Sequence, residues 1–486
     1  MLFNSIQFLF FFAIVMVLYF AIPYRFRWFL LLAASYYFYM TIKPGFIAFI
    51  LLSTFITYYA GLQMGKKESK SERKKFLLLG LVLNLGLLFL LKYYNFFGNS
   101  LSFLLTRFQI GYHIPALNLL LPVGISFYIF KSVSYSIDVY RGDQPPEKHL
   151  GHFALYVAFF PQLLAGPIER ATRFLPQVRE KFDFDYLRVA KGFRRMLWGL
   201  FQKMVIADNL APLVDSVYNN PTHYQGTSLV LATVFFAFQI YCDFSGYSDI
   251  AIGAAQVLGY RTMENFNRPY FSSSVPEFWR RWHISLSTWL RDYLYMPMGG
   301  NRVPIPRWYF NLFIVMLICG FWHGANWTFL IWGGLHGLYL ALSAFTQRMR
   351  RKFYEVIGLE RVPRLHRYLK VAVTFSLISF AWIFFRANNV TDAFYVVSHL
   401  PIGWKSVLHI QGLKETPFLA LKFELIIAMF SMALLILVHW MERRGPIVEN
   451  LSRRPVWLRW SVYYSIVLSI LLFGNIGVKQ FIYFQF

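Results

Sequence analysis

The sequence has little charge, few acidic residues and almost no cysteine for its length of 486 residues. Only 15% of the residues are charged, against about 25% in an ordinary soluble domain, while 57% are hydrophobic and 20% are aromatic. A soluble protein of this length needs more charge to cover its surface. The composition therefore excludes a soluble enzyme and a disordered chain, and it requires that lipid forms part of the solvent.

Acidic residues are scarcer than basic ones, with 23 Asp and Glu against 48 Lys and Arg and a formal net charge of +25. The basic residues stand in short blocks between apolar runs, which is typical of the cytoplasmic loops of membrane proteins. We therefore expect no nucleic-acid partner. The two cysteines, Cys242 and Cys319, lie inside apolar segments, which favours core packing over a disulfide and excludes a disulfide scaffold.

Long apolar runs fill most of the chain. A transmembrane helix needs about 20 predominantly apolar residues to cross about 30 Å of hydrocarbon, and the runs predict an all-α polytopic membrane protein with eleven or twelve crossings. The candidate spans are residues 6–23, 28–42, 45–63, 76–94, 117–137, 196–214, 227–258, 309–325, 327–346, 367–386, 421–440 and 460–477.

Two apolar runs do not fit a simple crossing. Residues 152–167 are interrupted by Pro161, Gly166 and Pro167, which indicates a re-entrant or interfacial segment buried in protein. Residues 227–258 are longer than one crossing requires, so we expect a tilted helix or a break near Gly246.

The basic blocks predict an orientation, because all of them fall on one side of the membrane if the span assignment is correct. The positive-inside rule makes that side the cytoplasm, so we expect the basic loops to be cytoplasmic and in contact with lipid. The basic segments are residues 24–27, 66–75, 138–149, 168–203, 261–307, 347–370 and 441–459.

A histidine stands inside the apolar sequence ICGFWHGANW at residues 318–327. Ionisable groups at membrane depth are costly and usually face a cavity or the bundle interior. His323 is flanked by two tryptophans, and a neutral imidazole within reach of a hydroxyl suits general-base catalysis. An imidazole that is only hydrogen-bonded within the bundle remains the alternative. His336 in WGGLHG fits a packing or supporting position better.

Two carboxylates stand in the apolar sequence IYCDFSGYSD at residues 240–249. Asp243 and Asp249 each need a partner in the membrane, either an arginine of residues 261–302 or a histidine. Asp243 is thus a candidate to orient an imidazole, as the acid of a catalytic triad does. Structural counter-ions are the open alternative for both carboxylates.

Residues 277–302, EFWRRWHISLSTWLRDYLYMPMGGNR, have an apolar and a polar stripe at helical spacing. They predict one amphipathic helix at the cytoplasmic interface. Arg280, His283 and Arg291 on the polar stripe are candidates to meet either a phosphate-bearing ligand or lipid headgroups. No Walker loop, G-x-S-x-G elbow or H-E-x-x-H motif stands where it would have structural support, and we expect neither a metal nor a bound cofactor.

Five ordered motifs make the sequence resemble the membrane-bound O-acyltransferase (MBOAT) family, and within it the branch that O-acetylates exported polysaccharides such as alginate. They cover residues 159 to about 337, whereas the hydrophobic layout matches nearly the whole chain. The motifs are FFPQLLAGPIER (159–170), YCDFSGYSDIAIG (241–253), ENFNRPYF (264–271), the block at 277–302, and CGFWHGANW (319–327).

The resemblance implies a bundle of helices around a central tunnel, with His323 of the WHG motif as the essential catalytic group and His283 of the RWH motif as a second one. Asp243, Asn326 and His336 are supporting candidates chosen by their position. We expect one integral membrane domain over residues 1–486. Its parts are N-terminal spans (1–150), a catalytic core (151–346) and C-terminal spans (347–486).

The implied activity is that of an acyltransferase. An acetyl group from a cytoplasmic donor, with acetyl-CoA as the expected co-substrate, would cross the membrane for O-acetylation of an exported polysaccharide, either directly or through an exported SGNH-type acetyltransferase. Arg280 and Arg291 are the donor-binding candidates. The related D-alanyl transfer to teichoic acid is the alternative within the family. A transporter or flippase of an acyl donor or lipid-linked sugar is the alternative from another class.

Overall fold

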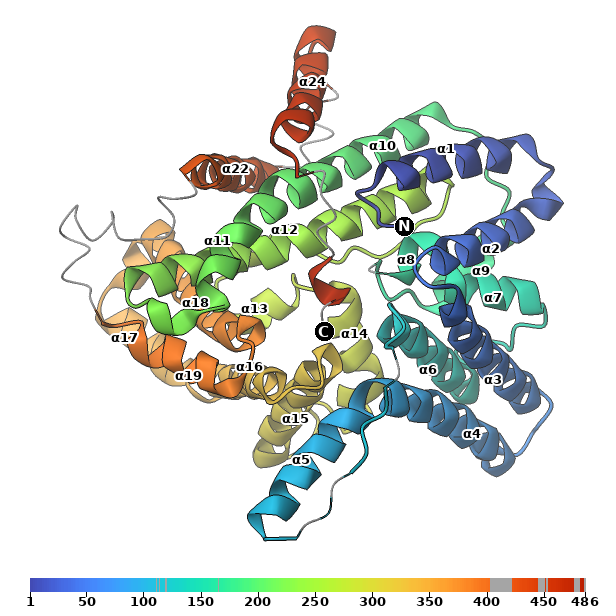
Figure 1. The fold of residues 1–486 in the computed structure, drawn as a ribbon, viewed down its shortest axis with the longest axis horizontal. Helices are drawn as coiled ribbons and strands as arrows, with labels where there is room; N and C mark the ends of the chain where they lie inside the picture. Colours follow the sequence, from blue (N-terminus) through green and yellow to red (C-terminus); the bar gives the residue numbers. More distant parts are fainter. Residues whose placement is uncertain are drawn as a thin grey trace.

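The computed structural model describes residues 1–402, 422–444, 451–475 and 481–484, apart from residues 111, 113, 119, 165 and 452. Within these ranges the chain consists of helices and connecting turns and contains no strand, which confirms the expected all-α fold (Figure 1). The longer helices are α1 (Ile6–Ala21), α2 (Tyr24–Met40), α3 (Ile47–Gly65), α4 (Lys70–Leu88), α5 (Tyr94–Arg107), α6 (Ile125–Arg141), α7 (Leu150–Ala158), α9 (Ala171–Val178), α10 (Tyr186–Phe201), α11 (Asp208–Tyr218), α12 (Thr227–Val257), α15 (Ile305–His323), α16 (Trp327–Phe345), α17 (Gln347–Val356), α18 (Pro363–Arg386), α19 (Val390–His399), α22 (Lys422–Met441) and α24 (Val456–Phe473).

Short helices and single helical turns connect these elements. They are η1 (Pro44–Phe46), η2 (Phe89–Tyr93), α8 (Phe160–Leu163), η3 (Gln202–Ala207), η4 (Pro221–His223), η5 (Pro269–Phe271), α13 (Val275–Trp279), α14 (Ile284–Leu290), η6 (Arg291–Tyr295), η7 (Leu359–Arg361), η9 (Glu442–Arg444) and η10 (Ile482–Phe484). Three of them, η2, η3 and η6, are π-helical.

Eight helical stretches among the described residues are long and apolar enough to cross a membrane, which makes the chain a multi-pass membrane protein. The expected eleven or twelve crossings include four further segments. Three of these form shorter helices, α1, α2 and α6, of 16, 17 and 17 residues, and 196–214 is divided among α10, η3 and α11. Residue 421 and residues 476–477 of the last two expected spans lie outside the described residues. The eight stretches are Pro44–Gly65, Lys70–Arg107, Thr227–Val257, Ile305–His323, Trp327–Phe345, Pro363–Arg386, Phe423–Met441 and Val456–Phe473.

Helices α3, α4 and α6 pack side by side on one flank of the molecule (Figure 1). Buried polar side chains join them. Ser53 Oγ donates to Asn84 Oδ1 at 2.6 Å, and Asn84 Nδ2 donates to Thr57 Oγ1 at 3.0 Å. Because lipid cannot satisfy such groups, hydrogen bonds between helices hold membrane bundles together. These bonds fix α3 against α4 beside α6, whose first residues point to the centre of the molecule.

The interrupted segment at 152–167 forms two short buried helices, α7 and α8, with Phe159 between them. Lys131 of α6 lies against the break, and its Nζ donates to the Tyr156 carbonyl at 3.0 Å and to Gln162 Oε1 at 2.8 Å. The protein itself thus supplies partners for a backbone that leaves the helical pattern, as expected at membrane depth.

Helix α12 is one continuous helix of 31 residues, so the break considered near Gly246 does not occur. Gly246 serves instead as a close contact with α10, because a Cβ added there would lie 2.6 Å from the Gly199 carbonyl oxygen. Small residues let two helix backbones approach each other in this way. The close contact of α10 with α12 explains how so long a helix is largely buried in protein.

Helices α15 and α16 form a tight hairpin. A Cβ on Gly320 would lie 2.2 Å from the Phe329 carbonyl oxygen, and a Cβ on Gly333 would lie 2.4 Å from that of Met316. The hairpin places the end of α15, with His323, next to the beginning of α16.

The first five basic segments contact one another. Arg27 Nη1 donates to the Phe182 carbonyl at 2.6 Å, and Arg73 Nη2 donates to that of Val139 at 2.5 Å. Further contacts are the Arg179–Glu147 ion pair, the hydrogen bond from Arg141 to the Asp292 carbonyl, and that from Gln177 to the Arg261 carbonyl. These contacts bring the five segments together in the fold, and their common side of the membrane stays a prediction.

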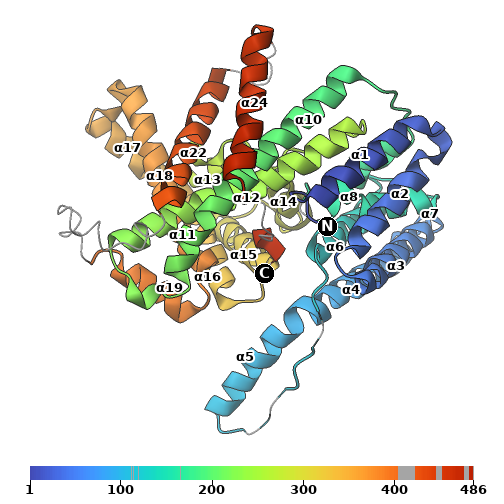
Figure 2. The same cartoon turned by 45° about the horizontal axis from the view of Figure 1, so that its top comes forward.

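The last described residues, 481–484, lie in the middle of the molecule (Figures 1 and 2), near α12, α14 and α15. Helices α5 and α24 extend away from the rest in opposite directions (Figure 2). The centre, where the family resemblance implies a tunnel, is thus approached by elements from the N-terminal, middle and C-terminal parts of the chain.

Candidate active site

The two histidines expected to be catalytic lie next to each other. His323 ends α15 and is 3% exposed, and His283 stands in the turn between α13 and α14 and is 0% exposed. Their ring centroids are 6.2 Å apart, with an angle of 50° between the planes. The fold therefore brings the RWH and WHG motifs into one buried site.

The prediction of a single amphipathic helix over residues 277–302 is wrong, because the segment is divided among α13, α14 and η6. The chain breaks at His283, whose φ of +42° is in the left-handed region, a conformation that costs a residue with a side chain about 1–2 kcal/mol. Neighbouring hydrogen bonds hold this turn. Ile284 N donates to the Asn265 carbonyl at 2.9 Å, and Ser285 Oγ donates to Asn265 Oδ1 at 2.6 Å. The break turns His283 into the interior while Arg280 remains exposed.

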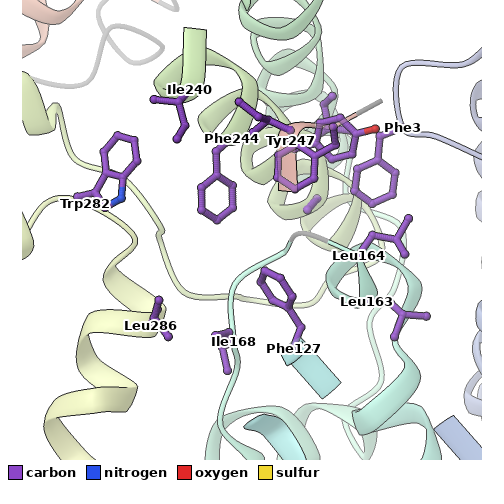
Figure 3. Close-up of a cluster of buried hydrophobic side chains, with 14 of the residues drawn as sticks. Phe3, Phe127, Leu163, Leu164, Ile168, Ile240, Phe244, Tyr247, Trp282 and Leu286 are labelled. Atoms are coloured by element: carbon purple, nitrogen blue, oxygen red, sulfur yellow. The ribbon is translucent and has the colours of Figure 1, made fainter. Parts of the chain in front are cut away.

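Aromatic rings enclose both histidines. The His323 ring lies 5.0 Å from Trp322 and 5.1 Å from Trp332, and the His283 ring lies 4.6 Å from Phe244. Figure 3 shows Phe244 and Phe127 among the hydrophobic side chains around this interior. Burial lowers the pKa of His283, which lies outside the eight candidate spans, to about 3, because a charged imidazole loses its hydration there. His283 is therefore neutral at physiological pH.

His336 stands one aromatic ring away from His323. Trp332 contacts both, with centroids 4.7 Å from His336 and 5.1 Å from His323. Trp279 Nε1 donates to His336 Nδ1 at 3.2 Å. An indole can only donate, so Nδ1 must be the unprotonated nitrogen and Nε2 carries the proton. This arrangement fits the supporting position expected of His336.

The carboxylates of α12 contact no histidine among the residues that the structure describes. Asp243 Oδ1 lies 2.5 Å from Lys203 Nζ, and Asp243 Oδ2 accepts from the Ile482 backbone N–H at 2.7 Å. Asp249 Oδ1 accepts from Arg195 Nε at 2.8 Å. Both are counter-ions of basic residues on α10 and η3. The expected pairing with an arginine of residues 261–302 is therefore wrong. Asp243 is also not placed to orient an imidazole as the acid of a catalytic triad does.

Asn326 has a local role. Its Oδ1 accepts from the Thr328 backbone N–H at 3.1 Å and so caps α16, while its Nδ2 donates to the Asn388 carbonyl at 3.4 Å. The side chain is thus committed to the α15–α16 connection, and it supports His323 by fixing the chain three residues beyond it.

Arg280 and Arg291, the donor-binding candidates, are exposed and lie outside the buried pocket of the histidines. Arg291 Nε donates to Asp292 Oδ1 at 2.8 Å. The Asp292 carboxylate also lies 3.7 Å from Arg170. These residues belong to the surface where the basic segments meet.

The π-helical turn η2 holds the end of α15 and was not recognised from the sequence. Lys92 Nζ donates to the carbonyls of Trp322 at 2.9 Å and His323 at 3.0 Å, and Tyr93 Oη donates to that of Phe321 at 3.1 Å. The last carbonyls of a helix have no partner within it. The signal was present, since Lys92 interrupts the apolar run LLFLLKYY, and an ionisable residue there is a functional indicator.

The C-terminal residues 481–484 also reach the site, although no motif in the sequence indicated a role for them. The Phe481 ring stacks on Tyr247 at 4.4 Å, and Ile482 is bound to Asp243. Phe484 lines a cavity next to His323. Among the residues that the structure describes, no cluster of three or more His, Cys, Asp or Glu side chains could hold a metal ion.

Fold and site together define a multi-pass helical membrane protein with a buried pair of histidines. The sequence pattern of the membrane-bound O-acyltransferase family matches residues 31–387. The chain therefore belongs to the MBOAT family and is a membrane acyltransferase, which confirms the resemblance found in the motifs.

Relatives with assigned names are similar over most of the chain. A protein named "Probable alginate O-acetylase AlgI" from Azotobacter vinelandii is 42% identical over 81% of this chain and 76% of its own length. A peptidoglycan O-acetyltransferase from Helicobacter pylori is 36% identical over 76% of this chain and 72% of its own. A teichoic acid D-alanyltransferase from Bacillus subtilis is 28% identical over 56% and 70%.

Proposed function

We propose that this protein takes an acetyl group from a cytoplasmic donor, acetyl-CoA, and passes it across the membrane for O-acetylation of an exported polysaccharide such as alginate. The observation that carries the proposal is the enclosed pairing of His283 with His323. Two relatives named for O-acetylation of cell-surface polymers support the acetyl group and the polymer.

The proposed reaction is an acyl transfer from a thioester. A hydroxyl oxygen attacks the thioester carbonyl carbon, His323 accepts the hydroxyl proton, the new C–O bond forms and the C–S bond breaks. The proton then passes from His323 to the leaving thiolate. A neutral imidazole suits the first step, because only the unprotonated ring accepts a proton. Neutral His283 lies next to His323, with the ring centroids 6.2 Å apart.

The donor approaches from the side where the basic segments meet, which we assign to the cytoplasm of a bacterium with the protein in the plasma (inner) membrane. Exposed Arg280 and Arg291 would attract the phosphates of the donor over a distance. The acceptor is a sugar hydroxyl or a hydroxyl of an exported SGNH-type acetyltransferase that relays the group to the polymer.

Replacement of His323 tests the proposal. In a His323→Ala variant that remains folded and inserted, acetylation of the polymer should disappear, whereas wild-type acetate content in that strain would overturn the catalytic assignment. Acetyl-CoA labelled in its acetyl group and supplied on the cytoplasmic side of membrane vesicles should label the polymer or the partner protein. Failure of that labelling would exclude acetyl-CoA as the donor.

D-alanyl transfer to teichoic acid is the second candidate, because of the D-alanyltransferase relative. The relatives named for O-acetylation have higher identity over more of the chain, which favours acetyl. This preference would be reversed if, in the vesicle assay, the D-alanyl thioester of a carrier protein served as the donor and acetyl-CoA did not. The alternative of a transporter or flippase, which would move its substrate without making or breaking a bond, has lost its support because the chain belongs to an acyltransferase family.

A further inference from the structure

A small cavity of about 80 Å³ lies next to His323. Its walls include Lys92 of η2, Trp322 and His323 at the end of α15, the first residues of α6, and Leu164. The cavity thus joins the essential histidine to a lysine that comes from a distant part of the chain. The size and the lining of this cavity determine which chemical group can bind next to His323.

Lys92 is held rigidly at this cavity. Its Nζ donates to the carbonyls of Trp322 and His323, and Tyr93 in the same π-turn donates to the preceding carbonyl. The Tyr93 ring also stacks on Phe321 at 4.2 Å. An ammonium has three N–H groups. Two of them donate to these carbonyls, so the third is available to donate to a ligand. Short π-helical turns are frequent at functional sites.

Two further donors stand at the same cavity. Trp322 Nε1 is buried and has no hydrogen-bond partner among the described residues, although buried donors are normally paired. The N-terminus of α6, at Gly124 to Ser126, also lines the cavity, and no side chain in the described part of the chain caps it. A helix N-terminus carries partial positive charge. The cavity is thus suited to an oxygen atom with negative charge.

The size of the cavity restricts the group that fits. An engineered apolar cavity of about 150 Å³ holds a benzene ring of six carbons, so about 80 Å³ suits three or four heavy atoms. An acetyl group has three. Leu164, which is 1% exposed, forms part of the wall, and a longer acyl chain would meet such walls.

We propose that this cavity is the acyl subsite, in which Lys92 Nζ and Trp322 Nε1 donate to the acyl oxygen and Leu164 limits the length of the acyl chain. The inference rests on the proposed acyl transfer at His323. When the acceptor hydroxyl attacks, the electron pair of the carbonyl bond moves to this oxygen. The two donors stabilise that charge until the C–S bond breaks and the thiolate takes the proton from His323.

Substitutions of the donors test the charge stabilisation, with purified protein in liposomes, acetyl-CoA and the polymer or partner as acceptor. Loss of one oxyanion donor typically lowers kcat by about 100- to 1,000-fold, so Lys92→Met should lower kcat by about this factor with little change in KM. Lys92→Arg should restore part of the rate. Trp322→Phe, which removes the N–H donor and keeps an aromatic ring of smaller size, should lower kcat by about tenfold or more.

Lys131→Met is the matched control, because Lys131 also donates to a buried carbonyl, that of Tyr156, and does not line the cavity. It should keep the kcat of the folded fraction. Wild-type kcat in folded Lys92→Met and Trp322→Phe would overturn the charge stabilisation, and so would an equal loss in Lys131→Met.

A chain-length series tests the size limit. Wild-type protein should transfer acetyl in preference to butyryl and octanoyl groups from their CoA thioesters, and Leu164→Ala should raise the butyryl-to-acetyl ratio of kcat/KM by about tenfold, the lower end of what one methylene is worth in a pocket. Leu163→Ala is the matched control, since Leu163 is equally buried beside it but does not line the cavity (Figure 3).

An unchanged ratio in Leu164→Ala, or the same shift in Leu163→Ala, would overturn the size limit. The outcomes separate this inference from the proposed function. If His323→Ala is inactive while the donor variants and Leu164→Ala behave as wild type, only the acyl subsite fails. If His323→Ala remains active, the proposed function fails first.

Discussion

The imidazole rings of His283 and His323 lie next to each other, with their centroids 6.2 Å apart and their planes tilted by 50°, although they belong to different motifs. One ring ends a long apolar helix, and the other stands at a turn whose backbone φ is in the left-handed region. The site is therefore assembled where a membrane helix ends against a segment that is not a membrane helix. Substitutions in either of these two segments are therefore expected to change the geometry of the site.

The first prediction concerns His283 and acid. Its pKa is about 3 in the folded protein and about 6.5 in an unfolded chain, so the unfolded state binds the proton more tightly. The resulting stability is fully present above about pH 6.5 and is lost as the pH falls towards 3, by up to about 1.4 kcal/mol per pH unit. Thermal unfolding of wild type and His283→Gln in detergent, between pH 7 and pH 4, measures this. The variant should show a flatter pH dependence, and parallel curves would contradict the prediction.

The second prediction concerns the proton on His336. Trp279→Phe removes the indole donor to Nδ1, a hydrogen bond worth about 1 kcal/mol, so the ring loses its tautomer preference. In the wild type, 15N NMR of labelled histidine should show His336 protonated at Nε2, and in the variant a mixture of tautomers. A wild-type signal from protonated Nδ1 would show that the geometry at Trp279 is not as described.

The third prediction separates two acidic partners of one lysine. Lys203 pairs with Asp243 at 2.5 Å and Asp208 at 2.8 Å, but only Asp243 also binds the Ile482 N–H. Removing one partner of a buried ion pair costs about 3–5 kcal/mol, so Asp243→Asn and Asp208→Asn should both lower the Tm. Asp243→Asn alone should loosen residues 481–484.

Hydrogen exchange of the C-terminal peptide checks this difference. Faster exchange in Asp243→Asn than in Asp208→Asn is the expected result. Equal exchange in the two variants would mean that the bond from Ile482 to Asp243 does not hold the segment.

The fourth prediction uses two adjacent glycines of α16. A Cβ on Gly333 would lie 2.4 Å from the Met316 carbonyl, whereas the nearest atom to a Cβ on Gly334 is 3.8 Å away. Gly333→Ala should therefore push α15 from α16, cost about 1–3 kcal/mol and impair transfer through displacement of His323. Gly334→Ala should be tolerated. Tm and acetyl transfer of the two variants measure this, and equal behaviour would rule out a tight hairpin.

The family and the membrane nature of the chain follow from local features of the sequence. Apolar length alone predicts helices that cross lipid, and the WHG and RWH motifs pointed to His323 and His283 before any contact was visible. The prediction of membrane helices succeeds because the requirement to bury backbone polar groups in lipid leaves helices as the natural solution. The catalytic roles of the two histidines stay predictions. Because polar groups are costly in lipid, the polar residues within apolar runs could also be identified as candidates for function.

Which of these polar residues contact one another depends on how the helices pack. The amphipathic pattern of residues 277–302 gave no sign of the break at His283, because Asn265, which supports the turn, lies outside the segment. Asp243 found Lys203 in place of an imidazole.

A helical membrane acyltransferase and its two candidate histidines can be predicted from the sequence alone. Three relationships appear only in the folded protein: these histidines lie next to each other, Lys92 holds the end of α15, and residues 481–484 reach the site. The physical reason is that a buried polar group takes whichever partner packing brings within about 3 Å. That partner comes from elements far away in the chain, beyond the reach of any local pattern.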